Sequence, residues 1–125
     1  MTLSGGEKQR VQFARVLAQI WEKPAQGYRY LFLDEPLNNL DISYQQEFLK
    51  LSAEFSKVNT ILIAVLHDLN LALSYADRIL FMKEGTIIHE ANSPGEVTSS
   101  VIKNVFDVNA TIIQPGNGHK PVVIY

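Results

Sequence analysis

The chain has 125 residues, of which 46% are hydrophobic and 19% charged, with a net charge of −2 and no cysteine. This length and composition predict a globular chain of at most one domain. They exclude a disulfide framework and a thiolate metal site, and the lack of a basic block argues against a nucleic-acid groove as the main surface. The longest apolar run, residues 61–66, is too short to span a bilayer, and no signal-peptide pattern is present. We therefore expect a soluble chain whose membrane role, if any, depends on a partner.

Residues 3–10, Leu-Ser-Gly-Gly-Glu-Lys-Gln-Arg, predict the start of a helix. Ser4 is a good N-cap, and Glu7, three residues later, completes a capping box. The helix should run to about Trp21 and be stopped by Lys23-Pro24. Its buried face would carry Val11, Ala14, Leu17, Ala18 and Trp21. Two glycines at the helix start leave backbone N–H groups open to an anion. Taken alone, a capped helix without a ligand is the simpler interpretation.

Residues 30–36, Tyr-Leu-Phe-Leu-Asp-Glu-Pro, predict a buried strand of a parallel sheet followed by two carboxylates. In open α/β sheets, ligands bind outside the carboxyl ends of the strands. Asp34 suits a Mg²⁺ ligand, and Glu35 suits a base that orients and deprotonates an attacking water. The alternative is an acidic surface turn without chemistry.

Asp41 can cap a helix over residues 42–56 whose buried face would carry Phe48, Leu51 and Phe55. Residues 60–66 are apolar and rich in β-branched side chains, which predicts a second buried strand. His67 follows at the carboxyl end of that strand, beside the same edge as the two carboxylates. A lone histidine after a strand is usually a hydrogen-bonded structural residue.

The remaining segment predicts smaller elements. Asp68 can cap a short helix over residues 69–76. The other expected elements are strands at 78–82 and 86–89 joined by a glycine turn, a capping box at Ser93-Pro94-Gly95-Glu96, a helical stretch bearing Val101, Ile102, Val105 and Phe106, and a terminal hairpin from 110–114 and 121–125. His89 and His119 have no motif around them, and we expect surface or packing roles for both.

Taken together, these segments resemble the ABC ATPases. The resemblance covers essentially the whole chain and rests on four stretches in the family's order: the signature motif in residues 3–7, the Walker B strand with its catalytic glutamate in 31–36, the D-loop in 37–41, and the strand with the switch histidine in 60–67. The chain departs from the family pattern at Glu7, where Gln is more usual, and at Leu37, where Thr is common.

The resemblance implies an α/β fold, namely a partial P-loop NTPase fold of the ABC type. It would combine parallel sheet strands with helices and a small C-terminal β-hairpin. Residues 1–125 would form the C-terminal part of one ABC ATPase domain. The 125 residues contain no Gly-x-x-x-x-Gly-Lys-Ser/Thr, so the P-loop half is absent from them. We expect this fragment alone to be inactive.

In the complete ATPase, the resemblance implies ATP and Mg²⁺ as cofactors and a homodimer of complete subunits paired head to tail. Asp34 would hold Mg²⁺, Glu35 would activate water, and His67 would contact the γ-phosphate. The signature residues Ser4, Gly5, Gly6 and Glu7 would form the binding site for the opposite subunit's nucleotide. Asp41 would link the two nucleotide sites.

Within the family, residues 67–72 and 75–78 resemble the importers of haem, iron-siderophores and cobalamin, and residues 15–21 and 44–46 favour haem. This resemblance implies an ATPase subunit at the cytoplasmic face of the inner membrane. Its partners would be membrane permease subunits and, indirectly, a substrate-binding protein. A siderophore or cobalamin importer is the alternative.

Two further classes remain as hypotheses. A chromosome-maintenance or DNA-repair ATPase carries a similar signature in its C-terminal half, but that family usually lacks Pro after the acidic pair and lacks His-Asp-Leu. Both are present here, as Pro36 and residues 67–69, so we expect no nucleic-acid partner. The other hypothesis is an inactive, truncated interaction module.

Overall fold

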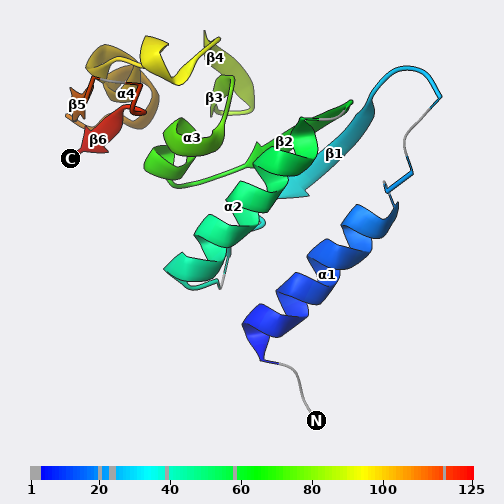
Figure 1. Cartoon of the computed structure of the whole chain (residues 1–125). Coiled ribbons are helices and arrows are strands. Elements are labelled where there is room, and N and C mark those ends of the chain that lie inside the picture. Colours follow the sequence, from blue (N-terminus) through cyan, green and yellow to red (C-terminus); the bar gives the residue numbers. More distant parts are fainter. Residues whose placement is uncertain (1–3, 20, 23–24, 39, 58, 117) are drawn as a thin grey trace. The chain divides into compact units, whose positions relative to one another are not determined.

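The computed structural model describes residues 4–19, 21–22, 25–38, 40–57, 59–116 and 118–125. The chain divides after His67 into two compact units, residues 1–67 and 68–125 (Figure 1). Each unit is described by itself. Within the described ranges, none of the helices combines the length and apolarity that crossing a membrane would need.

The first unit contains two strands and two helices: α1 (Gly5–Gln19), β1 (Arg29–Asp34), α2 (Ile42–Ser56) and β2 (Thr60–Val65). The two strands pair in parallel, from Arg29 opposite Thr60 to Asp34 opposite Val65. This is the predicted arrangement of parallel strands linked by a helix. Because the strands are parallel and in register, the residues that follow them leave the sheet at the same edge.

Side-chain caps set the starts of both helices, as the sequence predicted. The Ser4 N–H donates to Glu7 Oε2 at 2.8 Å and the Glu7 N–H donates to Ser4 Oγ at 3.3 Å, which is a reciprocal capping box. Asp41 Oδ1 accepts a hydrogen bond from the Tyr44 N–H at 3.0 Å. Local chemistry therefore defines where α1 and α2 begin.

The predicted buried face of α1 is wrong. Val11 is 47% exposed and Trp21 is 71% exposed, and α1 extends only to Gln19 among the described residues. The expected stop at Lys23-Pro24 lies outside the described residues. The helix instead packs on α2 through a different face. The ring centroids of Phe13 and Phe48 lie 4.0 Å apart, and the central guanidinium carbon of Arg10 lies 4.3 Å from the centroid of the Tyr44 ring.

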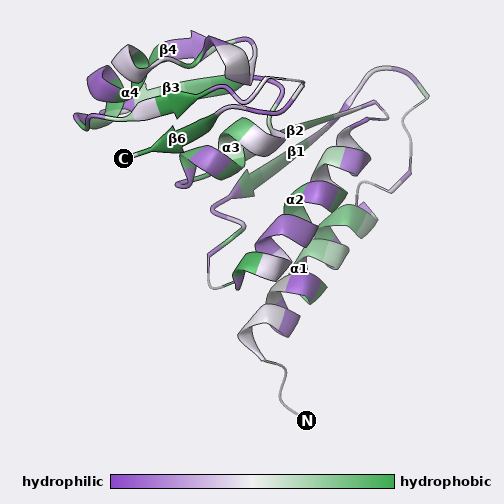
Figure 2. Cartoon of the chain, turned by 60° about the vertical axis from the view of Figure 1, so that its left-hand side comes forward, coloured by the Kyte–Doolittle hydropathy of each residue, from purple (hydrophilic) through white to green (hydrophobic). Residues whose placement is uncertain are grey.

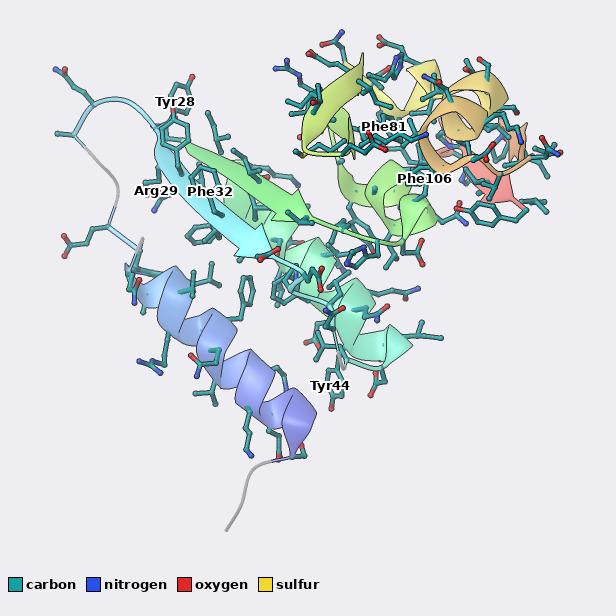
Figure 3. The ribbon with its side chains drawn as sticks, turned by 180° about the vertical axis from the view of Figure 1, so that it is seen from behind. Tyr28, Arg29, Phe32, Tyr44, Phe81 and Phe106 are labelled. Carbon is teal, nitrogen blue, oxygen red and sulfur yellow. The ribbon has the colours of Figure 1, made fainter. Side chains whose placement is uncertain are left out.

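Within the described residues of this unit, the two-strand sheet is covered on one face only, so the unit by itself does not bury the strands on both faces as expected. Leu31 and Thr60 are buried, and the Arg29 guanidinium lies 5.1 Å from the Phe55 ring of α2, which places α2 against this face. The opposite face carries five exposed apolar side chains: Tyr30, Phe32, Ile61, Ile63 and Val65. Phe32 is labelled in Figure 3. We call these five residues the bare sheet face. Figure 2 shows the apolar character of both strands.

The buried residues of α2 also differ from the prediction. Leu49 and Ser52 are the buried members of this helix, whereas Leu51 is 48% exposed and Phe48 and Phe55 are half-buried. Phe48 and Phe55 still make the ring contacts described above. The apolar pattern therefore identified the helix correctly, and the packing partner decided which residues are covered.

The second unit contains α3 (Leu69–Tyr75), β3 (Ile79–Lys83), β4 (Thr86–Ala91), the 3₁₀ turn η1 (Pro94–Glu96), α4 (Ser99–Phe106), β5 (Thr111–Ile113) and β6 (Val122–Ile124). Strands β3 and β4 form an antiparallel hairpin, and so do β5 and β6, as predicted. Glu84 and Gly85 both have positive φ in the first hairpin, the conformation that its two-residue turn requires.

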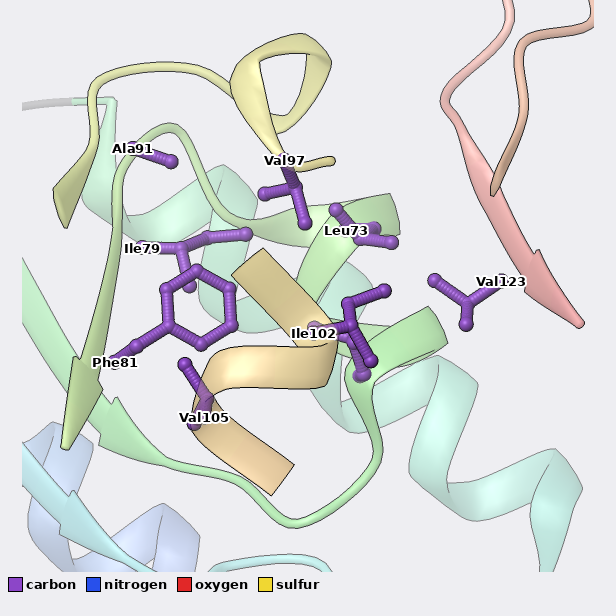
Figure 4. Packing of buried hydrophobic residues seen from close by; sticks show 9 residues of the cluster. Leu73, Ile79, Phe81, Ala91, Val97, Ile102, Val105 and Val123 are labelled. Atoms are coloured by element: carbon purple, nitrogen blue, oxygen red, sulfur yellow. The ribbon is translucent and has the colours of Figure 1, made fainter. Parts of the chain in front are cut away.

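One apolar core holds this second unit together. Its side chains come from α3, β3, β4, α4, β6 and the residue after η1: Leu69, Leu73, Ile79, Phe81, Ala91, Val97, Ile102, Val105 and Val123. Figure 4 shows how they pack and labels all of them except Leu69. Asn70 attaches β6 to α3, since its Oδ1 accepts from the Val123 N–H at 2.7 Å and its Nδ2 donates to the Val123 carbonyl at 3.1 Å.

The predicted capping box at residues 93–96 does not form. The Ser93 side chain makes no cap hydrogen bond, and Glu96 Oε2 instead accepts from the Asn92 N–H at 2.9 Å. Thr98 caps α4, because its Oγ1 accepts from the Val101 N–H at 3.3 Å. A short turn therefore stands where a helix start was predicted. Phe106, expected on the apolar side of α4, is 51% exposed.

Candidate active site

The carboxyl edge of the first sheet brings Glu35 and His67 together. Glu35 follows the last residue of β1, and His67 lies two residues beyond the end of β2. His67 Nε2 lies 2.6 Å from Glu35 Oε1, within hydrogen-bond distance. The side chains are 69% exposed for His67 and 40% exposed for Glu35, so a ligand can reach both. The predicted proximity of these two residues is confirmed.

The second oxygen of Glu35 is also held. The Asn38 side-chain Nδ2 donates a hydrogen bond to Glu35 Oε2, and the Asn38 backbone N–H donates to the Glu35 carbonyl at 3.2 Å. Residues 35–38 thus form a turn, with Pro36 at its second position, where proline fits best. Glu35 has a φ of 45°, in the left-handed region that costs a non-glycine residue about 1 kcal/mol or more.

These contacts lower the pKa of Glu35 below the ordinary value of a glutamate. The hydrogen bond from His67 is the largest cause, followed by the one from Asn38 and the charge interaction with His67. Sequence reasoning missed Asn38. Its spacing of three residues from Glu35 across a proline turn was the available signal, because asparagine is common in such turns.

Asp34 is the last residue of β1, and its side chain is exposed. Among the described residues, no group of three or more His, Cys, Asp or Glu side chains could hold a metal ion. A lone carboxylate still fits Mg²⁺, which usually binds through one or two carboxylates together with waters and substrate phosphates. The donor present therefore suits Mg²⁺ and does not suit a metal that needs a complete protein cage.

The residues at the start of α1 form a second candidate region. A side chain added at Gly5 would meet nothing within 4 Å, and one at Gly6 would meet only Leu40 Cδ2, at 4.0 Å. Packing inside the described part therefore does not explain these glycines. The Glu7 carboxylate is engaged in the cap, and the hydrogen bond from the Ser4 backbone is the main reason that its pKa is lowered.

The predicted site residues thus fall into separate groups. Asp34, Glu35 and His67 lie at one sheet edge. The signature residues lie at the start of α1, and no described hydrogen bond or ion pair joins Ser4 or Glu7 to Glu35 or His67. Asp41 caps α2. Of the predicted D-loop, Asn39 lies outside the described residues, as does Leu3 of the signature.

Comparison with known proteins shows which proteins the chain is similar to. No family model matches it. It is 43% identical over 125 residues to the hemin import ATP-binding protein HmuV of Myxococcus xanthus, covering 99% of the chain and 46% of that protein. The HmuV protein of Gloeobacter violaceus is 43% identical over 123 residues, or 98% of the chain and 45% of that protein. In sequence, the chain is therefore similar to slightly less than half of each of these two ATP-binding proteins.

Solved structures agree on the fold. An inward-facing ABC transporter of the metal-chelate type matches 98% of the chain and 47% of that structure's chain, with a TM-score of 0.73 at 21% identity. A dimeric ATP-binding cassette bound to ADP and phosphate matches 71% of the chain and 35% of its own, with a TM-score of 0.58 at 31% identity. The predicted partial P-loop fold of the ABC type is confirmed. The chain spans about half the length of the curated relatives it matches.

Proposed function

We propose that the chain is the C-terminal part of the ATP-binding and hydrolysing subunit of an ABC importer for haem. The observation that carries the proposal is the contact between Glu35 and His67 at the carboxyl edge of a parallel sheet. That edge is where open α/β sheets bind their ligands. The similarity to the hemin import ATP-binding proteins supports the choice of haem.

Glu35 is the base in this proposal. A glutamate is ionised at neutral pH, and the contacts from His67 and Asn38 lower the pKa of Glu35 further, so the carboxylate can accept a proton from the water that attacks the γ-phosphate. Each oxygen of the carboxylate has a second lone pair, so the bonds from His67 and Asn38 leave room for that water. His67 orients Glu35 and contacts the γ-phosphate. Asp34 would hold Mg²⁺, which would neutralise charge on the phosphates.

The start of α1 binds the nucleotide of the opposite subunit. The first N–H groups of a helix have no partner within the helix, and a phosphate would satisfy those of Gly5 and Gly6. The Ser4 hydroxyl accepts a bond from Glu7 and keeps its own proton for donation. Because the Glu7 carboxylate is engaged in the cap, it interferes less with an approaching anion.

This assignment requires two complete subunits paired head to tail, with Asp41 linking their sites and the P-loop supplied by the rest of each subunit. The described hydrogen bonds of Ser4 and Glu7 do not involve Glu35 or His67, which is compatible with a composite site of this kind. The complete protein would bind membrane permease subunits at the cytoplasmic face of the inner membrane. A substrate-binding protein would deliver haem to that assembly.

The test uses the complete subunit assembled with its permease in liposomes, with haem, a ferric siderophore and cobalamin offered separately. We expect ATP-dependent uptake of haem alone. Glu47→Gln, an exposed position on α2, is the control and should transport normally. Uptake of cobalamin or siderophore in place of haem would contradict the substrate. An assembly that never hydrolyses ATP would contradict the whole proposal.

A further inference from the structure

The loop after β1 restrains Glu35 through both of its oxygens. His67 Nε2 lies 2.6 Å from Oε1, and the Asn38 side-chain amide donates to Oε2. The two partners come from different places in the sequence, one after β2 and the other three residues after Glu35. These two contacts restrict rotation of the carboxylate about χ3, the terminal side-chain torsion, which otherwise takes a broad range of values in glutamate.

Asn38 is itself held in place by its loop. Its backbone N–H bonds to the Glu35 carbonyl at 3.2 Å, and the neighbouring Leu37 is buried at 9% exposure. Gln45 of α2 is hydrogen-bonded to the same loop: its Nε2 donates to the Leu40 carbonyl at 3.1 Å and to the Leu37 carbonyl at 3.4 Å. The amide of Asn38 is therefore carried by a segment that is anchored to α2.

We propose that Asn38 is a positioning residue for hydrolysis: its amide fixes Glu35 Oε2 while His67 fixes Oε1, so the carboxylate keeps one orientation before the substrate enters. The inference rests on the proposed ATPase function. Orienting a catalytic group in advance lowers the barrier, and a misplacement of about 1 Å can cost roughly 100-fold in rate. Asn38 is not required to touch the nucleotide, so its removal should lower kcat and leave ATP affinity unchanged.

The competing explanation is that Asn38 only stabilises the turn. Asn38→Asp separates the two, because aspartate keeps the size and the turn preference of asparagine but replaces the amide donor with a second carboxylate beside Glu35. Asn38→Ala removes the donor without adding charge. Asn104→Asp is the matched control, since it makes the same change at an exposed position of α4.

The experiment measures kcat, KM and the equilibrium dissociation constant for ATP in the complete subunit. We expect Asn38→Ala and Asn38→Asp to lower kcat by about 10- to 100-fold with ATP affinity within twofold of wild type. In a Glu35→Gln background, Asn38→Ala should cause no further loss. Wild-type kcat in Asn38→Asp, or an equal loss in both backgrounds, would overturn the proposal.

A second measurement applies even if those variants fold poorly. In ¹H–¹⁵N spectra of the complete subunit, the side-chain amide signal of Asn38 should shift in Glu35→Ala, which removes its acceptor. An unchanged signal would overturn the proposal. If wild type is inactive, or Glu35→Gln hydrolyses ATP normally, the proposed function fails. If wild type is active, Glu35→Gln is inactive and the Asn38 variants are normal, only the positioning role fails.

Discussion

Asn70 is predicted to hold the terminal hairpin in place. Its side chain makes both hydrogen bonds to the backbone of Val123, whose residue is only 3% exposed. Asn70→Ala would leave a buried N–H and a buried carbonyl without these partners. A lost hydrogen bond of this kind costs about 1–2 kcal/mol, so we expect the variant to lose roughly 2–4 kcal/mol of unfolding free energy. That is a large share of the ~5–15 kcal/mol that stabilises a typical domain.

The assay is denaturant unfolding together with hydrogen exchange at the Val123 amide. Asn70→Asp keeps the acceptor for the Val123 N–H and loses the donor to its carbonyl, so its loss should be about half that of alanine. Asn104→Ala, an exposed asparagine, should change stability by less than about 0.5 kcal/mol. If Asn70→Ala unfolds like wild type and Val123 exchanges at an unchanged rate, the two hydrogen bonds do not stabilise the hairpin.

Three further predictions concern the first unit. Folding lowers the pKa of Glu7 below its ordinary value of 4.5, so the cap stabilises the folded chain above that pH and its contribution is lost as the pH falls through the folded pKa. Glu7→Gln should therefore make the melting temperature depend less on pH between about pH 6 and 3, and an unchanged pH profile would contradict this. Ser4→Arg should prevent ATP-driven dimerisation of the complete subunit without weakening ATP binding by the monomer, whereas Gln19→Arg at the other end of α1 should dimerise normally by light scattering. The isolated chain should hydrolyse no ATP and self-associate through the bare sheet face, and adding the remaining half of the subunit in trans should give a nucleotide-binding heterodimer; a monomeric, active chain would refute this.

The self-association prediction rests on the exposed apolar side chains of the bare sheet face and on the strand edges beside it. In the described part of the chain, β2 is hydrogen-bonded to β1 and β3 to β4, in separate two-stranded sheets. An exposed strand edge with apolar side chains invites pairing with another chain. Phe32→Ser removes the most exposed of the sheet's apolar side chains, at 69%, and should reduce self-association measured by sedimentation. Val108→Ser, at an exposed position outside any strand, is the control.

Elements set by local chemistry could be predicted from the sequence. The helix at residues 42–56 and the Ser4–Glu7 capping box both formed as expected, because the cap and the helix it starts are neighbours in the chain. The β3–β4 hairpin followed from the glycine in its turn. The proximity of Glu35 and His67 followed from one further rule, that the carboxyl ends of parallel strands share an edge.

The predictions that were wrong concern burial, which depends on tertiary contacts. An apolar stripe predicts that some face of a helix is covered but not what covers it, so Val11 and Trp21 were expected inside and lie exposed. The same reason applies to the bare sheet face, whose residues have the pattern of a strand covered on both sides. Asn38 was missed because an asparagine in a turn has an ordinary structural explanation, and its bond to Glu35 depends on side-chain geometry.

The central claim is that Glu35 is the base of an ATPase, and one measurement tests it most directly. ATP binding and ATP turnover are compared for wild type and Glu35→Gln in the complete subunit, with Glu47→Gln as the control. We predict that Glu35→Gln binds ATP with wild-type affinity and turns it over roughly 10²- to 10⁴-fold more slowly, because the amide cannot accept the proton of the attacking water. Undiminished turnover in Glu35→Gln would contradict the account.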